Sequence, residues 1–305
     1  MTSSVTTLAS GLVGLAGTGG AAAVAVAMAR RGRPYLAGSH ALGTARRPFP
    51  LPDALRRGFA GATVAVRPGP RGELYVGSGE PVPGHTLRRL VLQPLNARIT
   101  KQGGRLYRAQ RAPFNLLLDF VGPDRDAETL GRAYRCLDGQ LRDHAGILTG
   151  YLAGRVRVGP VAVTVAGILD ARGLLATQRE RYAFAEGTFD DIGSSAAPAT
   201  LVPTVGEPWS WRFGWDGQDD ICAEERHLLH GLVREAHADG RTVRIGAVPA
   251  RSRKLRPAFW RELTTAGVDA IADPDLPGLA RYLRSSRPGR LADGRGGHAY
   301  AKIVR

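Results

Sequence analysis

The stretch YLAGSHALGTARRPFPLPDALRRGFAGATVAVRPGPRGELYVGSGE, residues 35–80, alternates apolar runs with turns rich in glycine and proline. It predicts a strand, a helix and two further strands, over residues 35–37, 52–58, 63–66 and 73–76. The first apolar run leads into Gly38-Ser39-His40, so His40 is expected at the carboxyl edge of a strand. That position is catalytic in barrel enzymes, because the active-site face collects the ends of the parallel strands.

The same alternation continues downstream. Helices are predicted over residues 86–95, 124–144, 223–239, 257–266 and 276–283, and a basic loop over 98–111. Strands are predicted over residues 116–118, 161–165, 181–184, 201–203, 242–248 and 268–272. Alternating strands and helices favour a parallel α/β sheet, and right-handed crossovers close such a sheet naturally. We therefore expect a single-domain α/β protein with a (β/α)8 TIM-type barrel.

The composition allows a large core and gives a strong positive charge. The chain has 305 residues, enough for one barrel of about 250 residues, and is 43% hydrophobic. Its formal net charge is +15, and Lys supplies only three of the 42 basic residues. Either a compositional bias supplies Arg in place of Lys, or the charge attracts anionic lipid, phosphoesters or nucleic acid. No five basic residues are consecutive, so a nucleic-acid-binding arm is not indicated.

The two ends of the chain differ from the middle. Residues 1–33 are expected to be a signal or membrane anchor, because the first 29 carry no charge and Leu8–Ala29 is long enough to cross a bilayer. A nucleotide-binding loop at Gly17–Ala22 would need an acid about 20 residues later, and residues 35–45 have none. The barrel is expected over residues 34–285, followed by a basic, mobile tail over 286–305. The expected location is membrane-associated or secreted, with the cytoplasm as the alternative.

Two other sets of residues leave alternatives open. Cys136 and Cys222 are too few for a disulfide scaffold or a zinc site, so they form one bridge after export or remain two buried thiols. Glu224, His227 and His230 share one face of a predicted helix. Helical zinc pairs more often use i,i+4 spacing, so a solvent-facing polar stripe is the preferred interpretation.

A long aromatic loop is expected over residues 207–220. It contains Trp209, Trp211 and Trp215. Indole rings suit boundaries between water and apolar surroundings, so this loop is either a lid or membrane contact, or ordinary packing at the rim of the barrel.

Several pieces follow one another in a recognisable order: Ser39–Leu42, Pro50–Leu55, Thr63–Arg67, Gly72–Ser78 and Thr86–Leu95. They resemble the phosphatidylinositol-specific phospholipase C and glycerophosphodiester phosphodiesterase superfamily, in particular its bacterial and fungal branch of the "altered inheritance of mitochondria" type. The family pieces run His-Asn-Asp-Tyr, "PL-DAL--G--SVEADV", "G-LLVGHD" and "TL--LYLDPL". Weaker pieces within residues 114–121, 181–187, 236–244 and 260–269 extend the resemblance over residues 35–285.

The chemistry of that family is only partly retained. Its Glu-x-Asp metal pair falls on Ala65 and Arg67, and its second His falls on Ser78, while one acid survives as Asp119. Members of the family use calcium or magnesium, and hard cations require several oxygen ligands. With most ligands replaced, the resemblance implies that this chain uses no metal and no other cofactor.

The candidate site follows from the same resemblance. Metal-independent relatives place an arginine where others bind calcium, and a guanidinium suits phosphoryl oxygens. We therefore expect His40 as the base, Arg67 as the cation and His85 as the acid, with Asp119 and Ser78 as ligand-binding residues. In the opposing interpretation, Arg67 is a solvated strand end and His85 an ordinary loop residue.

Three functional hypotheses remain open. The resemblance implies a phosphoric diester hydrolase acting on glycerophosphodiesters or inositol phospholipids, and the replaced ligands imply that its metal-dependent activity is lost. The first hypothesis is retained binding of a phosphate-bearing small molecule or a phospholipid head group. The second is metal-independent cleavage through His40 and Arg67. The third is peripheral attachment to an anionic membrane through charge.

Overall fold

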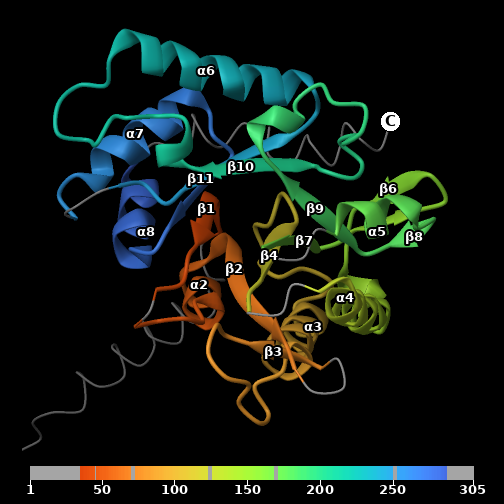
Figure 1. Cartoon of the computed structure of the whole chain (residues 1–305). Helices are drawn as coiled ribbons and strands as arrows, with labels where there is room; N and C mark the ends of the chain where they lie inside the picture. The colour runs from red at the N-terminus through yellow and green to blue at the C-terminus, as the bar shows by residue number, and fades with distance from the viewer. Residues whose placement is uncertain are drawn as a thin grey trace, which may run out of the picture. The chain divides into compact units, whose positions relative to one another are not determined.

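The computed structural model describes residues 35–44, 46–69, 73–122, 126–167, 171–249 and 253–286. Eight parallel strands close into a barrel: β1 (Leu36–Ala41), β2 (Phe59–Pro68), β4 (Phe114–Phe120), β7 (Val161–Gly167), β9 (Ala183–Gly187), β10 (Thr204–Pro208), β11 (Thr242–Gly246) and β12 (Ala270–Asp273). The barrel is closed because β1 pairs with both β12 and β2 (Figure 1). The predicted (β/α)8 barrel is therefore confirmed.

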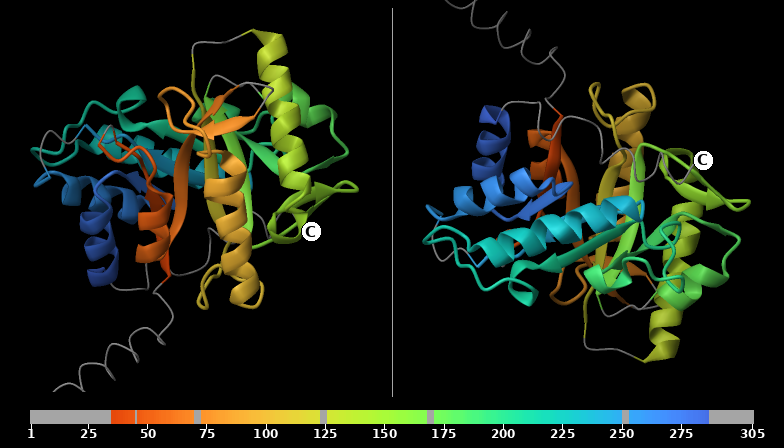
Figure 2. Two further views of the ribbon diagram at one scale, coloured as in Figure 1. Left: turned by 90° about the horizontal axis from the view of Figure 1, so that it is seen from below. Right: turned by 90° about the horizontal axis from the view of Figure 1, so that it is seen from above.

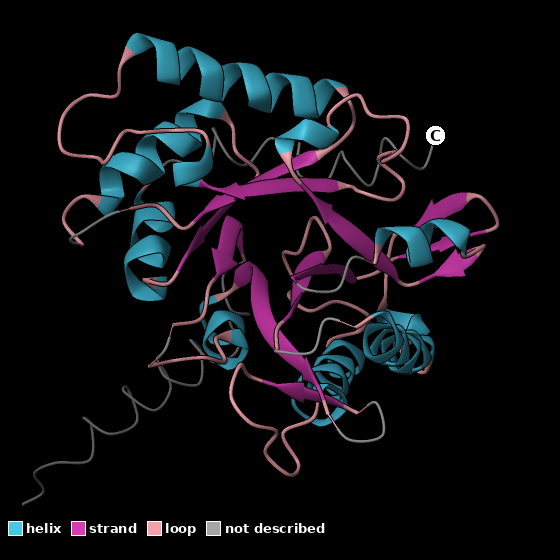
Figure 3. Cartoon of the chain, in the orientation of Figure 1, coloured by secondary structure: helices cyan, strands magenta, loops and turns pink. Residues whose placement is uncertain are grey.

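Helices surround the strands (Figure 3). They are α2 (Leu51–Arg57), α3 (Gln93–Lys101), α4 (Ala127–Arg142), α5 (Arg172–Thr177), α6 (Ala223–Ala238), α7 (Arg256–Ala266) and α8 (Leu276–Ser285). A π-helical turn, η2 (Arg88–Leu92), runs into α3, and short 3-10 turns form η3 (Ala145–Ile147), η4 (Phe189–Asp191) and η5 (Trp209–Trp211). Between β9 and β10 the described chain forms η4 and no longer helix. Figure 2 shows the helices alongside the strands from below and from above the view of Figure 1.

Local sequence explains where several of these helices begin and end. Gly58 follows α2 with a φ of 87°, a left-handed conformation that glycine adopts without steric cost. Asp126 caps α4, since its side chain accepts a hydrogen bond from Thr129 N. Asp275 caps α8 in the same way through Gly278 N. Leu116–Leu118 in β4 form a continuous apolar run, as expected for a strand covered by helices.

Some predicted boundaries were wrong. The strand expected at residues 201–203 begins instead at Thr204, because Leu201 N and Val202 N donate to Pro198 O in a turn. The basic loop expected from residue 98 starts only after Lys101, since Ile99 is buried one helical turn after Leu95. The strand expected at residues 181–184 is divided, because Glu180–Arg181 (β8) pairs with another strand.

That other strand belongs to a small second sheet, which the sequence did not predict. β5 (Gly150–Leu152) and β6 (Arg155–Arg157) form a hairpin, and β8 pairs with β5. Val156 of this hairpin packs with Ala162 and Phe184 from the barrel strands. The hairpin precedes β7 in the chain, so this packing lies toward the amino ends of the barrel strands.

The aromatic loop packs mainly against the barrel. Trp209 is buried, and its ring stacks on Phe213 at 4.3 Å and meets Phe259 edge-on at 5.4 Å. Trp211 is 67% exposed. Both cysteines are free thiols, and Cys222 is exposed, contrary to the expectation of a bridge or two buried thiols.

Helices able to span a bilayer are absent from the part of the chain that the structure describes. The predicted signal or anchor over residues 1–33 lies outside those residues. The predicted tail over 286–305 also lies outside them, apart from Ser286.

Candidate functional site

Several barrel strands point a polar side chain into the interior of the barrel. His40 on β1, Thr63 on β2, Asp119 on β4, Glu186 on β9 and Arg244 on β11 form a set that we call the polar barrel cluster. Asp119 and His40 are the second-last residues of their strands, as is Glu186. The cluster therefore lies toward the carboxyl ends of the strands, where barrel enzymes place their active sites.

His40 is a buried imidazole held against β2. It is 0% exposed, and its Nε2 lies 2.9 Å from Thr63 Oγ1. Its Nδ1 faces Gly61, where a Cβ atom would stand only 2.5 Å away, and has no hydrogen-bond partner among the described residues. Burial, and then the charge of Arg244, hold the pKa of His40 well below its usual value of 6.5. The imidazole is therefore neutral at physiological pH.

Arg244 and Glu186 form an ion pair inside the barrel. Arg244 donates from both Nε and Nη2 to Glu186 Oε1, and the Nε distance is 3.0 Å. Glu186 Oε2 is buried without a hydrogen-bond partner in the described part of the chain. Burial raises the pKa of Glu186 although the charge and hydrogen bonds of Arg244 lower it. Glu186 therefore takes up a proton more readily than an exposed glutamate.

Asp119 is the second acid of the cluster. Burial raises its pKa, and Arg244 opposes that shift. Asp119 in turn raises the pKa of Glu186, because two nearby carboxylates disfavour each other's charge. Arg244 is therefore the charge that acts on all three titratable groups of the cluster.

The structure divides the predicted site residues between two places. His40 and Asp119 both belong to the polar barrel cluster. Arg67, near the end of β2, donates to Gly79 O at 3.1 Å and to Glu80 Oε1 at 3.0 Å. Ser78 is exposed in the turn after β3 (Leu74–Val76), and His85 is exposed in the following loop. Among the described residues, no side-chain hydrogen bond or ion pair joins these three to the cluster.

Sequence reasoning missed Glu186 and Arg244. Glu186 directly follows the apolar residues of a predicted strand, so the argument that selected His40 applies to it equally. Arg244 is a charged residue within an otherwise apolar predicted strand, where a long side chain must point into the barrel or to solvent. Neither signal depends on the family resemblance.

Among the described residues, the side chains of the polar barrel cluster do not fit a calcium or magnesium ion. Within the described ranges, no three His, Cys, Asp or Glu side chains converge as a metal-binding group. The cluster offers two carboxyl groups, and Arg244 already occupies Glu186. Such cations require six or more oxygen ligands or several waters, and the described side chains of the cluster supply too few of them.

Comparison with known proteins finds similar folds among solved structures and no match to a family model or a curated protein. The structure of a glycerophosphodiester phosphodiesterase from Parabacteroides distasonis aligns with a TM-score of 0.49 and 11% identity, covering 82% of this chain and 98% of that one. Protein CitE from Mycobacterium tuberculosis, solved with magnesium and acetate, aligns with a TM-score of 0.39 and 13% identity over 82% and 92%.

These likenesses are too distant to indicate a shared activity. The class of the protein rests instead on its own strand pairing, which closes eight parallel strands into a (β/α)8 barrel. The polar barrel cluster is the candidate site of this barrel, because Arg244 acts there on two carboxyl groups and a neutral imidazole.

Proposed function

We propose that the barrel binds a phosphate-bearing small molecule at the carboxyl ends of its strands, without a divalent cation. The ordered pieces that resemble phosphodiester hydrolases support the choice of ligand. The position of the cluster supports the choice of end, because ligands of barrel proteins bind where the strands finish.

Arg244 carries this proposal. A guanidinium binds phosphoryl oxygens through charge-assisted and often bidentate hydrogen bonds. Both hydrogen bonds of Arg244 go to one oxygen of Glu186, and its Nη1 makes none with the described residues. The Arg244 guanidinium can therefore bind a phosphate while it stays hydrogen-bonded to Glu186.

The two acids favour an anion through their protonation. Burial raises the pKa of both Asp119 and Glu186. A bound phosphate is an additional negative charge nearby, which raises those pKa values further. Proton uptake then removes the repulsion between the acids and the phosphate, so binding should strengthen as the pH falls from neutrality.

Isothermal titration with glycerophosphoinositol and with glycerol 3-phosphate, in the presence of chelator, tests the proposal. We expect saturable binding that weakens at least tenfold in Arg244→Gln, as expected for loss of about 1.5–3 kcal/mol from a hydrogen bond to a charged group. Arg234→Gln on α6 is the matched control, because Arg234 is exposed. Equal affinities in both variants, or no saturable binding in the parent, would refute it.

One observation favours metal-independent cleavage as a second function. The cluster places a neutral base, His40, together with an acid, Asp119, whose pKa burial raises in the direction that suits a proton donor. In this reaction a ligand hydroxyl loses its proton to His40 and attacks phosphorus, while Asp119 protonates the departing oxygen.

This second function predicts cleavage of a glycerophosphodiester in chelator. The product assay should lose its signal in both His40→Ala and Asp119→Asn. Arg67→Gln should abolish cleavage if the reaction uses the site that the sequence predicted. It should leave cleavage intact if the reaction uses the polar barrel cluster, which does not contain Arg67. Binding without turnover in the parent would leave the first function alone standing.

A further inference from the structure

The amino ends of β4 and β7 form a basic surface. Residues 81–118 and 144–169 contain no acidic residue. The end of α3, the loop before β4 and the hairpin before β7 expose a set of basic side chains that we call the amino-end basic face: Lys101, Arg105, Arg108, Arg111, Arg155 and Arg157. Because these segments precede adjacent parallel strands, they lie at the same end of the barrel.

The two parts of this face are fixed to each other. Gln110 Nε2 donates to Pro160 O at 2.7 Å, which joins the loop before β4 to the segment before β7. Gln110 Oε1 also accepts from Leu106 N at 2.8 Å, and Leu106 and Tyr107 are buried. The arginines are therefore carried by a packed loop.

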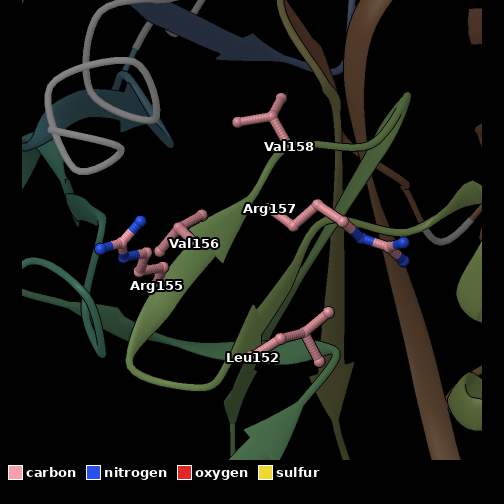
Figure 4. Close-up of a pocket in the computed structure, with 5 residues that line it drawn as sticks. All are labelled: Leu152, Arg155, Val156, Arg157 and Val158. Atoms are coloured by element: carbon pink, nitrogen blue, oxygen red, sulfur yellow. The ribbon is translucent and has the colours of Figure 1, made fainter.

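An open hollow of about 470 Å³ lies in the hairpin, lined by Leu152, Arg155, Val156, Arg157 and Val158. Figure 4 shows the guanidinium groups of Arg155 and Arg157 on the two sides of the hairpin. Val158 is 46% exposed and gives the surface an apolar element beside the two arginines. Glu180, opposite Leu152 across the small sheet, is the neighbouring acid.

One segment at the other end of the barrel is rich in acidic residues. The segment that follows β10 and enters α6 carries the acids Asp216, Asp219, Asp220, Glu224 and Glu225. Because it follows a strand, this segment belongs to the carboxyl end. An anionic surface therefore attracts the amino-end basic face and repels this carboxyl-end segment.

We propose that the amino-end basic face docks the protein on an anionic lipid bilayer. Each Lys or Arg held near such a surface contributes about 1 kcal/mol. Cations around an exposed apolar hollow match the polar head groups and the apolar boundary of a bilayer. A nucleic acid would match the charge but not the apolar centre.

Docking in this way has a consequence for the ligand, which rests on the proposed function. The polar barrel cluster lies toward the carboxyl ends, away from the docked end. Its phosphoester would then arrive from water and not from the bilayer beneath the protein. A soluble glycerophosphodiester fits this arrangement better than an intact phospholipid.

Vesicle co-sedimentation of the full chain tests the docking. The vesicles contain phosphatidylcholine alone, or equal parts of phosphatidylcholine and phosphatidylserine. The test variant combines Arg105→Gln, Arg108→Gln and Arg155→Gln. The control combines Arg234→Gln, Arg261→Gln and Arg281→Gln, which remove the same charge from exposed positions on α6, α7 and α8. Thermal unfolding of both variants establishes that they are folded.

The test variant should bind anionic vesicles on the order of 100-fold more weakly, from about 1 kcal/mol for each arginine, and the control should lose far less. Equal weakening would mean that net charge alone drives binding, and would overturn the proposal. Tighter binding to single-stranded RNA than to anionic vesicles, lost in the same test variant, would also overturn it. Titration of glycerophosphoinositol into both variants should be unchanged, so failure of docking is distinguishable from failure of the phosphoester site.

Discussion

Arg244 on β11 reaches past β10 to Glu186 on β9, and its Nε lies 3.0 Å from Glu186 Oε1. The two residues are neighbours only because Gly206, on the strand between them, has no side chain. A Cβ atom at Gly206 would stand 2.9 Å from Glu186 Oε1 and 2.6 Å from the backbone oxygen of Arg244. Because Gly206 lacks a Cβ atom, the ion pair can join β11 to β9 across β10.

Replacing one residue of this ion pair should lower the free energy of unfolding more than replacing both. Arg244→Met leaves a buried carboxyl group unpaired, and we expect the free energy of unfolding at neutral pH to fall by roughly 3 kcal/mol. The double variant Arg244→Met with Glu186→Leu should recover most of that loss, since neither charge remains buried. Urea unfolding measures both. A double variant as unstable as the single one would contradict an ion pair whose main cost is burial.

Gly61→Ala should destabilise the barrel. The new methyl group would stand 2.5 Å from His40 Nδ1 and 2.8 Å from Asn115 O, so the imidazole or the backbone must move, at roughly 1–3 kcal/mol. Gly139→Ala is the matched control. Gly139 lies within α4, where a Cβ atom meets nothing within 4 Å, and the change should stabilise by about 0.5–1 kcal/mol. Thermal unfolding that shifts both variants in the same direction would be inconsistent with this packing.

His40 should make the stability fall as the solution becomes acidic. Its folded pKa is held well below 6.5, while the unfolded chain titrates near that value. Above the unfolded pKa both states are neutral. Below it the unfolded state binds one more proton, so stability decreases by about 1.4 kcal/mol per pH unit until the folded pKa is reached.

The difference between the parent and His40→Gln isolates this contribution from those of other groups. Stability measured by urea unfolding between neutral and mildly acidic pH should fall more steeply in the parent. Parallel pH profiles would mean that the imidazole titrates normally in the folded protein.

Asp273 should be among the acids on which the fold depends most. It is 0% exposed, and it accepts from Arg256 Nη1 at 2.8 Å, Trp260 Nε1 at 3.0 Å and Asp275 N at 2.7 Å. Asp273→Ala leaves the half-buried guanidinium of Arg256 and the buried indole N–H of Trp260 without their acceptor, and should cost about 3 kcal/mol. Glu128→Gln, which removes an exposed ion pair with Arg132, should cost less than about 1 kcal/mol. Comparable losses by urea unfolding would argue against burial as the cause.

The secondary structure was largely predictable because it depends on local periodicity. Continuous apolar runs such as Val161–Val165 predicted strands that helices cover, and Gly58 predicted the end of α2. The failures came from contacts between distant segments. Glu180 and Arg181 look like part of the following strand, but β5 draws them into a separate sheet. No local pattern records which partner a short strand will find.

The family resemblance placed the candidate site residues along the chain without their geometry. It selected Arg67 by alignment to a metal ligand and Ser78 by alignment to the second His of the family, and the structure puts Arg67 on β2 and Ser78 in the turn after β3. It retained His40 and Asp119, which do lie in the polar barrel cluster. A resemblance identifies equivalent positions, but a replaced side chain finds its own partner, as Arg67 does with Glu80.

The sequence by itself determined the barrel and the end of β1 on which His40 stands, because the alternation of apolar strands and amphipathic helices follows from the periodicity of residues close together in the chain. Only the tertiary structure decided that Arg244, 58 residues after Glu186, supplies the cation of the cluster. Closure of the sheet determines which inward-facing side chains meet, and the missing Cβ of Gly206 permits this meeting. Burial then sets the protonation of the groups around that cation.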